Sequence, residues 1–553
     1  MTDDPLLKMK RSNPLLVFDR LEVGPVKVER RRISTPYRLF YNGKEDRIDL
    51  MYTYEEAVFD PADPAAQNLA AVIGAQVAFN YGLFCKKIIF RDAFDNADIG
   101  FIRDMMENTS REIYVKKFLE FNHYLIGEAA HLPMEKKPRY LEAELEFPET
   151  LRKTDRARWD FWPTERRRHA ILSSGGKDSL VSQGLLDEIG CETHPIYINE
   201  SGRHWFTALN AYRYFKENIP NTARVWTNSD RVFNWMLRHM PFIRPDYANI
   251  RSDEYAVRLW TVAVFSFGAL PLMRKRGIGR LLIGDEFDTT RRASRRGITH
   301  YDGLYDQSSY FDNALSRYYL RKGWNISQFS ILRPLSDLLI QKILVKRYPH
   351  LQEQQVSCHA AHKEGFRIHP CGACEKCRRI IGMLKALDAD PSRCGYSENQ
   401  VQKALENFAF AHLKQESACA RQVTFMLAEK KLVNIPSSVK KFANGSAEVL
   451  KLRFDPERSP IHGIPLDLRV PLYSIYLEYA DGAVQRSDRQ WKAIDPLADM
   501  SLHRPYAFEV APIAAAGTPR PKVRWTVPPE LIKHDIPKDL PENAVMELTL
   551  HDK

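Results

Sequence analysis

His169-Ala170-Ile171-Leu172-Ser173-Ser174-Gly175-Gly176-Lys177-Asp178-Ser179 is the stretch that decides the fold of this chain. Its apolar start predicts a strand, and the residues over 180–186 that follow it have the pattern of a helix. The adjacent glycines let the backbone turn with its N–H groups directed inward, and a helix N-terminus adds partial positive charge. Lys177 adds a full charge, and the serine hydroxyls donate further hydrogen bonds. The stretch therefore predicts a site that holds phosphate groups.

The spacing of this turn differs from those of the P-loop and the Gly-x-Gly-x-x-Gly dinucleotide turn. A tight strand-to-helix turn with an incidental lysine is the alternative interpretation. Ser-Gly-Gly-Lys-Asp-Ser resembles the SGGxDS loop of the PP-loop ATP pyrophosphatase superfamily, whose members split ATP into AMP and pyrophosphate while adenylating a substrate. The resemblance implies an adenylate-forming enzyme. Its ATP-binding residues would be Ser173, Ser174, Gly175, Gly176, Lys177, Asp178, Ser179 and Asn199.

Four cysteines within twenty residues form a second constellation: Cys358, Cys371, Cys374 and Cys377. Thiolates at Cys-x-x-Cys spacing can reach one tetrahedral Zn²⁺ when the chain turns tightly, and the glycine at position 372 permits that turn. Four sulfurs close the coordination shell, so the spacing predicts a structural zinc site. Buried free thiols or a redox pair is the alternative. Three histidines nearby are spare ligands: His359, His362 and His369.

Length and composition limit the class of protein. The chain has 553 residues and 64.1 kDa, which suggests about three compact units, and its hydrophobic content of 44% is ordinary for a globular protein. No run of eighteen apolar residues exists, and the N-terminus has no apolar signal region. We therefore expect neither membrane insertion nor export. Cysteines used as metal ligands fit a reducing cytoplasm.

The charge balance suits an anionic partner. A net charge of +11 and a pI near 9.1 are compatible with a nucleotide, a nucleotide sugar or RNA, and charge alone does not choose among them. The arginine runs at 30–32 and 166–168 are explained as well by a solvated face. The pairs at 291–292 and 295–296 follow a strand end, so we expect a mobile loop over 287–299 that grips phosphates.

The order of elements predicts an α/β protein. Residues 1–150 have strand periodicity and then two helical stretches, over 65–84 and 99–125, which indicates an N-terminal α+β domain, and 126–165 have the prolines of a linker. From His169 we expect strands over 170–173, 193–199, 223–227, 280–284 and 328–332, with helices between them over 178–189, 205–218, 254–276 and 308–321. This alternation predicts a doubly wound, mostly parallel sheet over 160–350, the PP-loop and HUP-like core.

Ligands of such sheets bind at the carboxyl ends of strands, so three strand ends are candidate site positions: the turn at Ser174, residues 199–201 and residues 284–286. Asp285 and Glu286 lie where a catalytic carboxylate or Mg²⁺ ligand is expected, and a buried structural carboxylate or a helix cap is the alternative. Asp178 could contribute to Mg²⁺ coordination, or it could cap the helix that begins there.

The rest of the chain divides into two further segments. Residues 351–433 hold the cysteines and then a helical pattern over 377–430. Residues 434–553 hold 14 of the 33 prolines and short apolar runs such as 472–477, which favour a separate β-rich module. That module could bind substrate, another protein chain, or only the core.

Two families narrow the resemblance. The loop together with the late cysteine cluster resembles 7-cyano-7-deazaguanine synthase, whose family adenylates a carboxylate and uses ammonia to make a nitrile. Over residues 30–390 the chain is more similar to the UDP-N-acetylmuramoyl-L-alanyl-L-glutamate epimerase family, through residues 175–179, 305–311 and 331–338. The 120 additional residues at the C-terminus depart from that family.

Both resemblances imply one chemical step. A substrate carboxylate, small or part of a nucleotide sugar, attacks the α-phosphorus of ATP, and pyrophosphate leaves into the 174–179 turn while Mg²⁺ and Lys177 neutralise charge. Epimerisation then needs a general base, with Glu286, Asp285 and Glu200 as candidates, whereas the synthase reaction needs ammonia. The expected catalytic residues are Lys177, Asp178, Asp285 and Glu286. A PP-loop tRNA-modifying enzyme and a non-catalytic nucleotide-binding scaffold are the alternatives; nucleic acid is possible as a partner but not favoured.

Overall fold

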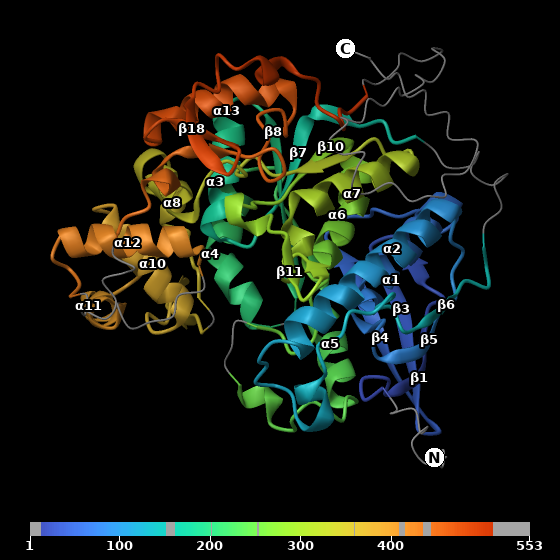
Figure 1. The fold of residues 1–553 in the computed structure, drawn as a ribbon. Helices are drawn as coiled ribbons and strands as arrows, with labels where there is room; N and C mark the ends of the chain where they lie inside the picture. Colours follow the sequence, from blue (N-terminus) through green and yellow to red (C-terminus); the bar gives the residue numbers. More distant parts are fainter. Residues whose placement is uncertain are drawn as a thin grey trace, which may run out of the picture.

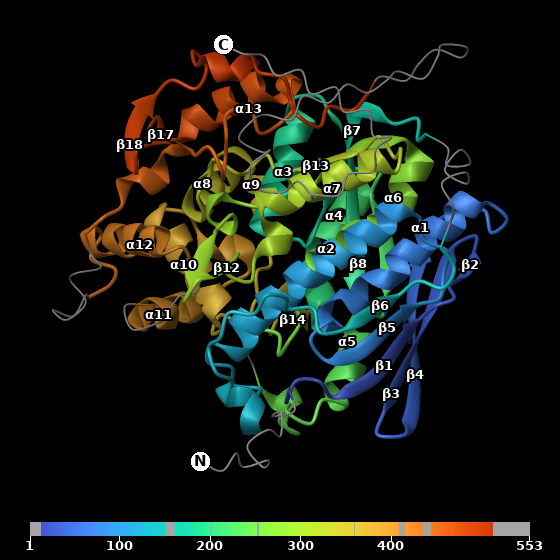
Figure 2. The same cartoon turned by 45° about the vertical axis from the view of Figure 1, so that its right-hand side comes forward.

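One large sheet organises the molecule (Figures 1 and 2). The computed structural model describes residues 13–150, 161–200, 202–250, 254–358, 360–408, 415–434 and 444–511. Eleven strands pair in the order β13-β10-β7-β8-β9-β4-β3-β1-β5-β6, with β2 paired to β3. These strands are β1 (Phe18–Val23), β2 (Lys27–Glu29), β3 (Arg32–Tyr41), β4 (Lys44–Tyr54), β5 (Cys85–Phe90), β6 (Glu144–Glu146), β7 (Glu165–Leu172), β8 (Glu192–Glu200), β9 (Ala223–Thr227), β10 (Ile278–Leu282) and β13 (Ser327–Phe329).

The half of the sheet that carries the loop is parallel and doubly wound, as the sequence predicted. The chain runs from β7 outward to β8 and β9, then returns to the other side of β7 with β10 and β13. The direction reverses between β7 and β10, and such a reversal opens a crevice at the carboxyl ends of the strands. The helices of this half are α3 (Lys177–Glu188), α4 (Arg203–Asn218), α5 (Ser229–Arg238), α6 (Val262–Arg276), α7 (Ser309–Arg321), α8 (Asp337–Arg347) and α9 (Pro349–Gln352).

Helices cover both faces of these strands, and Figure 1 shows α3 and α4 on one side of β7 and β8 and α6 on the other. All five residues of β10 are buried, because a parallel strand between two helical layers has no face toward water. Even Arg280 in this strand is fully buried, where it pairs with Asp467 at 2.7 Å and Glu509 at 3.0 Å from the C-terminal region.

The N-terminal region extends the same sheet. β4 pairs antiparallel with β9, with Tyr52 opposite Thr227, so the predicted α+β segment is continuous with the core through main-chain hydrogen bonds. Its helices are α1 (Pro64–Ala75) and α2 (Asn96–Ile113), which continue as a 3₁₀ turn (Gln76–Tyr81) and a π turn (Tyr114–Phe118). The predicted linker 126–165 adds β6 to the sheet edge, beside β5. Its residues 151–160 lie outside the described residues.

One predicted helix starts later than its periodicity indicated. The sequence predicted a helix over 254–276, but α6 begins at Val262. The carboxylate of Asp306 accepts hydrogen bonds from the N–H groups of Thr261 and Val262, at 2.8 and 2.7 Å. This side chain comes from a distant segment and satisfies the first free donors of the helix, so the start is fixed by tertiary structure.

The cysteine segment consists of short elements around one small core. A hairpin of β14 (His362–Glu364) and β15 (Arg367–His369) precedes the helices α10 (Glu375–Ala386), α11 (Glu398–Glu406) and α12 (Ser417–Glu429). The predicted helical pattern over 377–430 is therefore three helices, and its residues 409–414 lie outside the described residues. Figure 1 shows this unit beside α3, α4 and α8.

The C-terminal region contains a three-stranded sheet of β16 (Leu452–Phe454), β17 (Ala483–Ser487) and β18 (Gln490–Ile494). The apolar run 472–477 was expected in a strand, but it lies in α13 (Leu466–Tyr479). The helix buries Leu468, Leu472 and Tyr476, whose four-residue spacing places them on one helical face. The six residues 472–477 are too few to show this periodicity in the sequence. Among the described residues, no helix combines the length and the apolar character needed to cross a membrane.

Candidate nucleotide site and metal centre

The glycine turn is held tightly against the next helix. Gly175 has φ +74°, and a Cβ there would lie 2.8 Å from the carbonyl oxygen of Thr207 in α4, so this position requires glycine. Gly176 is the N-cap residue of α3, and no side chain caps that helix. Ser179 donates to the carbonyl oxygen of Gly176 at 3.1 Å and lies 3.2 Å from the hydroxyl of Ser173. The turn is therefore compact, and no side chain of the described residues caps the start of α3.

Lys177 lies at the centre of a group of carboxylates. Its side chain is 4% exposed, and its Nζ is 2.5 Å from Asp178, 2.6 Å from Asp337 and 3.9 Å from Glu286. Burial acts against its charge, but the three carboxylates outweigh burial and hold the pKa of Lys177 above its ordinary value. The lysine is therefore charged over the whole neutral range. Asp178 does not cap α3, so the capping alternative is wrong.

Two of the three predicted strand ends meet at this group. Gly284 follows β10, and a Cβ on it would lie 2.7 Å from Cβ of Asp178, so the end of β10 touches the first turn of α3. Glu286 faces Lys177 from this strand end. Burial raises the pKa of Glu286, and the neighbouring carboxylates Asp178 and Asp288 raise it further. Burial also raises the pKa of Asp288, to about 6. The site thus contains more negative charge than its lysine can balance.

Asp285 points into a different network. It is 3% exposed, and its Oδ2 lies 3.5 Å from the guanidinium of Arg333. Arg333 also pairs with Asp312 at 2.6 Å, and Ser330 holds the backbone of Asp285 through its N–H at 3.0 Å and its carbonyl at 2.7 Å. Burial raises the pKa of Asp285 despite Arg333. This geometry fits the structural alternative for Asp285 better than contact with the phosphates.

The sequence analysis missed Asp337. This residue starts α8 directly after the N-cap Ser336, and it contacts Lys177 at 2.6 Å, Gln415 at 2.6 Å and Arg379 at 3.7 Å. Burial acts against its charge, but Lys177 and Arg379 hold the pKa of Asp337 below its ordinary value. A serine followed by an acid at the start of an apolar helix was the available signal, but it indicates only a helix start. Its distance from residue 177 in sequence concealed the pair.

The third predicted strand end, residues 199–201 at the end of β8, has other contacts. Glu200 accepts a hydrogen bond from Ser229 at 2.6 Å and lies 3.9 Å from Arg258, so its carboxylate is held at the start of α5. Asn199 is buried at the end of β8, and Ser201 lies outside the described residues. The partners of Glu200 are therefore Ser229 and Arg258 and not Lys177.

The predicted mobile arginine loop is a short hairpin. Residues 293–295 and 298–300 pair as β11 (Ala293–Arg295) and β12 (Ile298–His300), after a 3₁₀ turn (Phe287–Thr289). Arg291 pairs with Asp302 at 3.0 Å, and Arg295 pairs with Glu120 at 3.0 Å. Two of the four arginines expected to grip phosphates are therefore bound to carboxylates of the chain.

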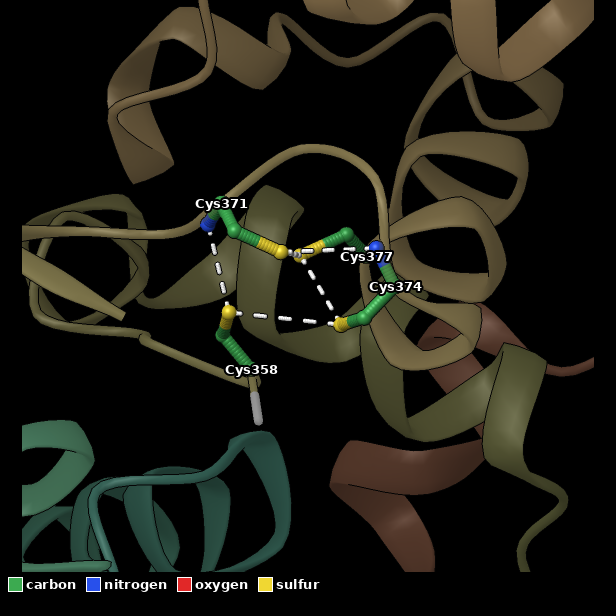
Figure 3. A group of neighbouring side chains, drawn as sticks. All are labelled: Cys358, Cys371, Cys374 and Cys377. Carbon is green, nitrogen blue, oxygen red and sulfur yellow. Dashed lines mark hydrogen bonds between the residues drawn. The ribbon is translucent and has the colours of Figure 1, made fainter. Parts of the chain in front are cut away.

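The four cysteines converge as the spacing predicted (Figure 3). Their sulfur atoms all lie within 4.8 Å of one another, with 3.4 Å between Cys374 and Cys377, 3.9 Å between Cys371 and Cys377, and 4.0 Å between Cys358 and Cys374. A tetrahedral zinc with Zn–S bonds of about 2.3 Å places its sulfurs about 3.8 Å apart. The cluster could therefore hold a zinc ion with little rearrangement.

Local geometry supports the thiolate form of this centre. The N–H groups of Ala360 and Cys371 point at the sulfur of Cys358 at 3.3 and 3.2 Å, and such donors stabilise metal-bound thiolates. Gly372 has φ +71°, which confirms the tight turn expected there. Of the spare histidines, His369 lies 3.2 Å from the carbonyl of Gly395, and His359 lies outside the described residues. His362 belongs to the exposed hairpin.

Two contacts join the cysteine centre to the nucleotide turn. The N–H of Val356, two residues before Cys358, donates to the carbonyl of Gly175 at 3.4 Å. Arg379, two residues after Cys377 in α10, lies 3.7 Å from Asp337, which in turn binds Lys177. Residues that flank the cysteines therefore contact the backbone of the turn directly and its lysine indirectly, through Asp337.

The carboxylates do not form a metal cluster of their own. Among the residues that the structure describes, only the four cysteines bring three or more ligand atoms within 4.8 Å of one another. Protein sites for Mg²⁺ commonly use one or two carboxylates together with substrate phosphates. Asp178 and Glu286 fit that pattern, because both lie beside Lys177 at the mouth of the turn.

Fold and site define a class: a doubly wound α/β protein with a glycine turn at its switch point and a four-cysteine centre. No protein-family model matches the chain, and no curated protein is similar to it in sequence. Among solved structures, the chain is similar to the crystal structure of a predicted subunit of tRNA methyltransferase from Methanocaldococcus jannaschii. The two are 18% identical, the match covers 42% of this chain and 94% of that chain, and the TM-score is 0.18.

Proposed function

We propose that this protein is an AMP-forming enzyme that binds ATP at the 174–179 turn and transfers its adenylyl group to an acceptor. The observation that carries the proposal is the buried Lys177 at the uncapped N-terminus of α3, at the switch point of the parallel sheet. Backbone amides, a helix N-terminus and a permanent positive charge together stabilise a departing pyrophosphate. A purely structural turn has no need of a buried lysine.

The chemical step follows from this placement. An acceptor oxygen attacks the α-phosphorus of ATP, the bond between the α-phosphorus and its bridging oxygen breaks, and pyrophosphate leaves with the electron pair. Water, or ammonia in the amidation alternative, then attacks the acyl carbon of the adenylate, and AMP leaves with the electron pair of the C–O bond. Lys177 neutralises the oxygens of the leaving group, and the surplus carboxylates Asp178 and Glu286 would hold Mg²⁺ with the phosphates. Binding of a cation would relieve the unfavourable negative charge that raises the pKa of Glu286.

The acceptor in this proposal is a carboxylate, most like that of a muramoyl-dipeptide glutamate epimerase. Amidation to a nitrile, as in 7-cyano-7-deazaguanine synthase, is the related alternative within a nucleobase modification or defence system. A non-catalytic nucleotide-binding scaffold remains the third reading. The buried Lys177 and the carboxylates around it argue against the scaffold hypothesis, because simple binding does not require this much buried charge.

A PP-loop enzyme that modifies tRNA is the second candidate. Phe366 at the tip of the β14–β15 hairpin is 90% exposed, and its carbonyl is held by Arg213. An exposed aromatic ring beside arginine can stack on an unpaired base, and the net charge of +11 favours a polyanion. This candidate predicts affinity for tRNA that falls steeply with salt, and loss of that affinity in Phe366→Ala.

The test is to identify the nucleotide products by mass spectrometry. The protein is incubated with ATP and Mg²⁺ alone, with a panel of carboxylates, and with bulk tRNA. We expect AMP and pyrophosphate, and the arm that stimulates them identifies the acceptor class. Formation of ADP and phosphate would contradict the adenylation reading, and no turnover in any arm would favour the scaffold.

A further inference from the structure

A cavity of about 530 Å³ lies between the core and the C-terminal region. Its walls come from α7, β13 and the segments 456–464 and 506–508. Glu457 ties these walls together, since its carbonyl accepts from Ser309 at 3.0 Å and its carboxylate accepts from Tyr310 at 3.0 Å. The cavity is therefore a built feature of the interface between the two regions.

One wall of this cavity is connected to the site around Lys177. Ser330 and Arg333 line the cavity, and both bind Asp285. Asp285 precedes Glu286, whose carboxylate lies 3.9 Å from Lys177. The cavity thus adjoins the carboxyl end of β10, where acceptors of α/β enzymes are positioned.

The chemistry of the lining restricts its ligand. Aromatic and aliphatic side chains make up much of the wall: Tyr310, Phe329, Tyr473, Tyr506, Phe508 and Ile464. Three arginines also line the cavity, at positions 317, 333 and 458, against two acids, Asp312 and Glu457. Apolar walls with an excess of positive charge complement an apolar molecule that carries an acid group, and cavities of this volume hold small organic molecules.

We propose that this cavity binds the acceptor of the adenylyl group, and that the acceptor is a small organic acid with an aromatic or aliphatic body. The inference rests on the proposed function for the reaction, but the binding site stands on the cavity itself. The apolar body lies among the aromatic walls, and the carboxylate faces the arginines at 317 and 458, because Arg333 already pairs with Asp312 and Asp285. Asp312 positions Arg333 through its 2.6 Å ion pair.

Two adjacent positions of α7 provide a matched pair of variants. Asn313 lines the cavity and is half-buried, so Asn313→Trp fills the space without entering the core. Ala314 has the same burial class and does not line the cavity, so Ala314→Trp introduces the same side chain elsewhere. Thermal melting of both variants checks that they are folded.

The probes are 4-phenylbutyrate, indole-3-propionate and octanoate, each with its neutral amide, and binding is measured by saturation-transfer NMR. We expect at least one acid to bind the wild type and Ala314→Trp equally, to bind Asn313→Trp at least tenfold more weakly, and to bind more tightly than its amide. ATP affinity, measured by calorimetry, should be the same in all three proteins. Absence of binding by every acid, or equal binding by Asn313→Trp, would overturn the proposal.

Product analysis separates this proposal from the proposed function. An acid that binds in the cavity and stimulates AMP formation supports both. AMP formation together with unchanged acid binding by Asn313→Trp would refute the cavity alone. Binding in the cavity with no AMP from any acceptor would refute the adenylation reaction, and with it the role of the cavity ligand as acceptor.

Discussion

The nucleotide turn and the cysteine centre are built in opposite ways. The centre takes its four ligands from twenty consecutive residues, and a single glycine with φ +71° gives the turn that joins two of them. The group around Lys177 takes its carboxylates from the start of α3, the end of β10 and the start of α8. A candidate metal centre can thus be encoded locally, whereas the proposed nucleotide site is complete only after the sheet and three separate segments have assembled.

The two regions also differ in how their charge is balanced. A bound Zn²⁺ would offset two of the four thiolate charges and would contribute directly to the folding free energy. The proposed nucleotide site has its own cation in Lys177, yet burial, with neighbouring carboxylates as a further cause, raises the pKa values of Glu286 and Asp288 there. The centre is therefore expected to act on stability and the turn on catalysis, with the contacts of Val356 and Arg379 as the links between them.

The largest expected effect is that of Lys177→Ala. Pyrophosphate release should fall at least about a thousandfold, because the lysine that faces these carboxylates is lost. The variant should also unfold more easily, by about 2–4 kcal/mol, because the buried Asp337 loses its closest cation and keeps only the more distant Arg379. Coupled pyrophosphate assays and thermal melting measure the two effects.

A double variant separates the two effects of that substitution. Lys177→Met with Asp337→Asn removes both members of the buried pair, so stability should largely recover. Activity should not recover, because the charge that stabilises pyrophosphate is still absent. Activity of the double variant within tenfold of the wild type would contradict the assigned role of Lys177.

The difference between local features and features assembled from distant segments explains how much could be predicted from the sequence. Alternation of strands and helices predicted the parallel core, and β9 matches the expected 223–227 in full, because these patterns are local. The cysteine spacing predicted the converged cluster for the same reason. The continuity of the N-terminal segment with the core sheet was not predictable, since it depends on the pairing of β4 with β9.

Within the candidate site, the residue that the sequence analysis did not predict is distant in sequence from the turn. Asp337 lies 2.6 Å from Lys177 but 160 positions later in the chain, and no local pattern connects them. Glu200 ends a strand in the expected way, yet Ser229 and Arg258 hold it elsewhere. The end of a strand predicts the edge of the sheet on which a side chain lies, but it does not predict which residues that side chain contacts.

The next effect concerns the metal centre itself. Cys374→Ser should lose bound zinc and melt at least about 5 °C lower, because metal binding contributes to the folding free energy. Cys191→Ser, at a half-buried cysteine outside the cluster, should keep zinc and melt as the wild type does. Elemental analysis and thermal melting provide the measurement. One equivalent of zinc retained by Cys374→Ser would refute the four-thiolate centre.

A smaller effect tests the link between the two regions. Arg379→Ala should keep its zinc but bind ATP about tenfold more weakly, because Asp337 loses one of its two cations and Lys177 is then held more strongly by that carboxylate. Arg378 is the adjacent residue and donates to the carbonyl of Ala373, away from Asp337. Arg378→Ala should therefore bind ATP normally. Equal ATP affinities in the two variants, by calorimetry, would show that the regions are independent.

The smallest expected effect concerns the surplus charge of the nucleotide site. Burial raises the pKa of Asp288 from 3.8 to about 6, so between these pH values the folded protein keeps a proton that the unfolded chain has lost. The cost of ionising Asp288 in the folded state therefore grows from pH 4 to pH 6 and stays constant above pH 6. Asp288→Asn removes that cost, so it should stabilise the protein by about 1–2 kcal/mol at pH 7.5 and by little at pH 4.5.

Thermal melting at pH 4.5, 5.5, 6.5 and 7.5 measures this difference against Asp488→Asn, whose carboxylate is 92% exposed. The gain should rise with pH in the first variant and be absent in the second. Mg²⁺ with ATP should reduce the gain, because a cation bound among these carboxylates offsets the same repulsion. A stabilisation that is equal at all four pH values would mean that the pKa of Asp288 is not raised, and the assignment of an unfavourable buried carboxylate to this site would then be wrong.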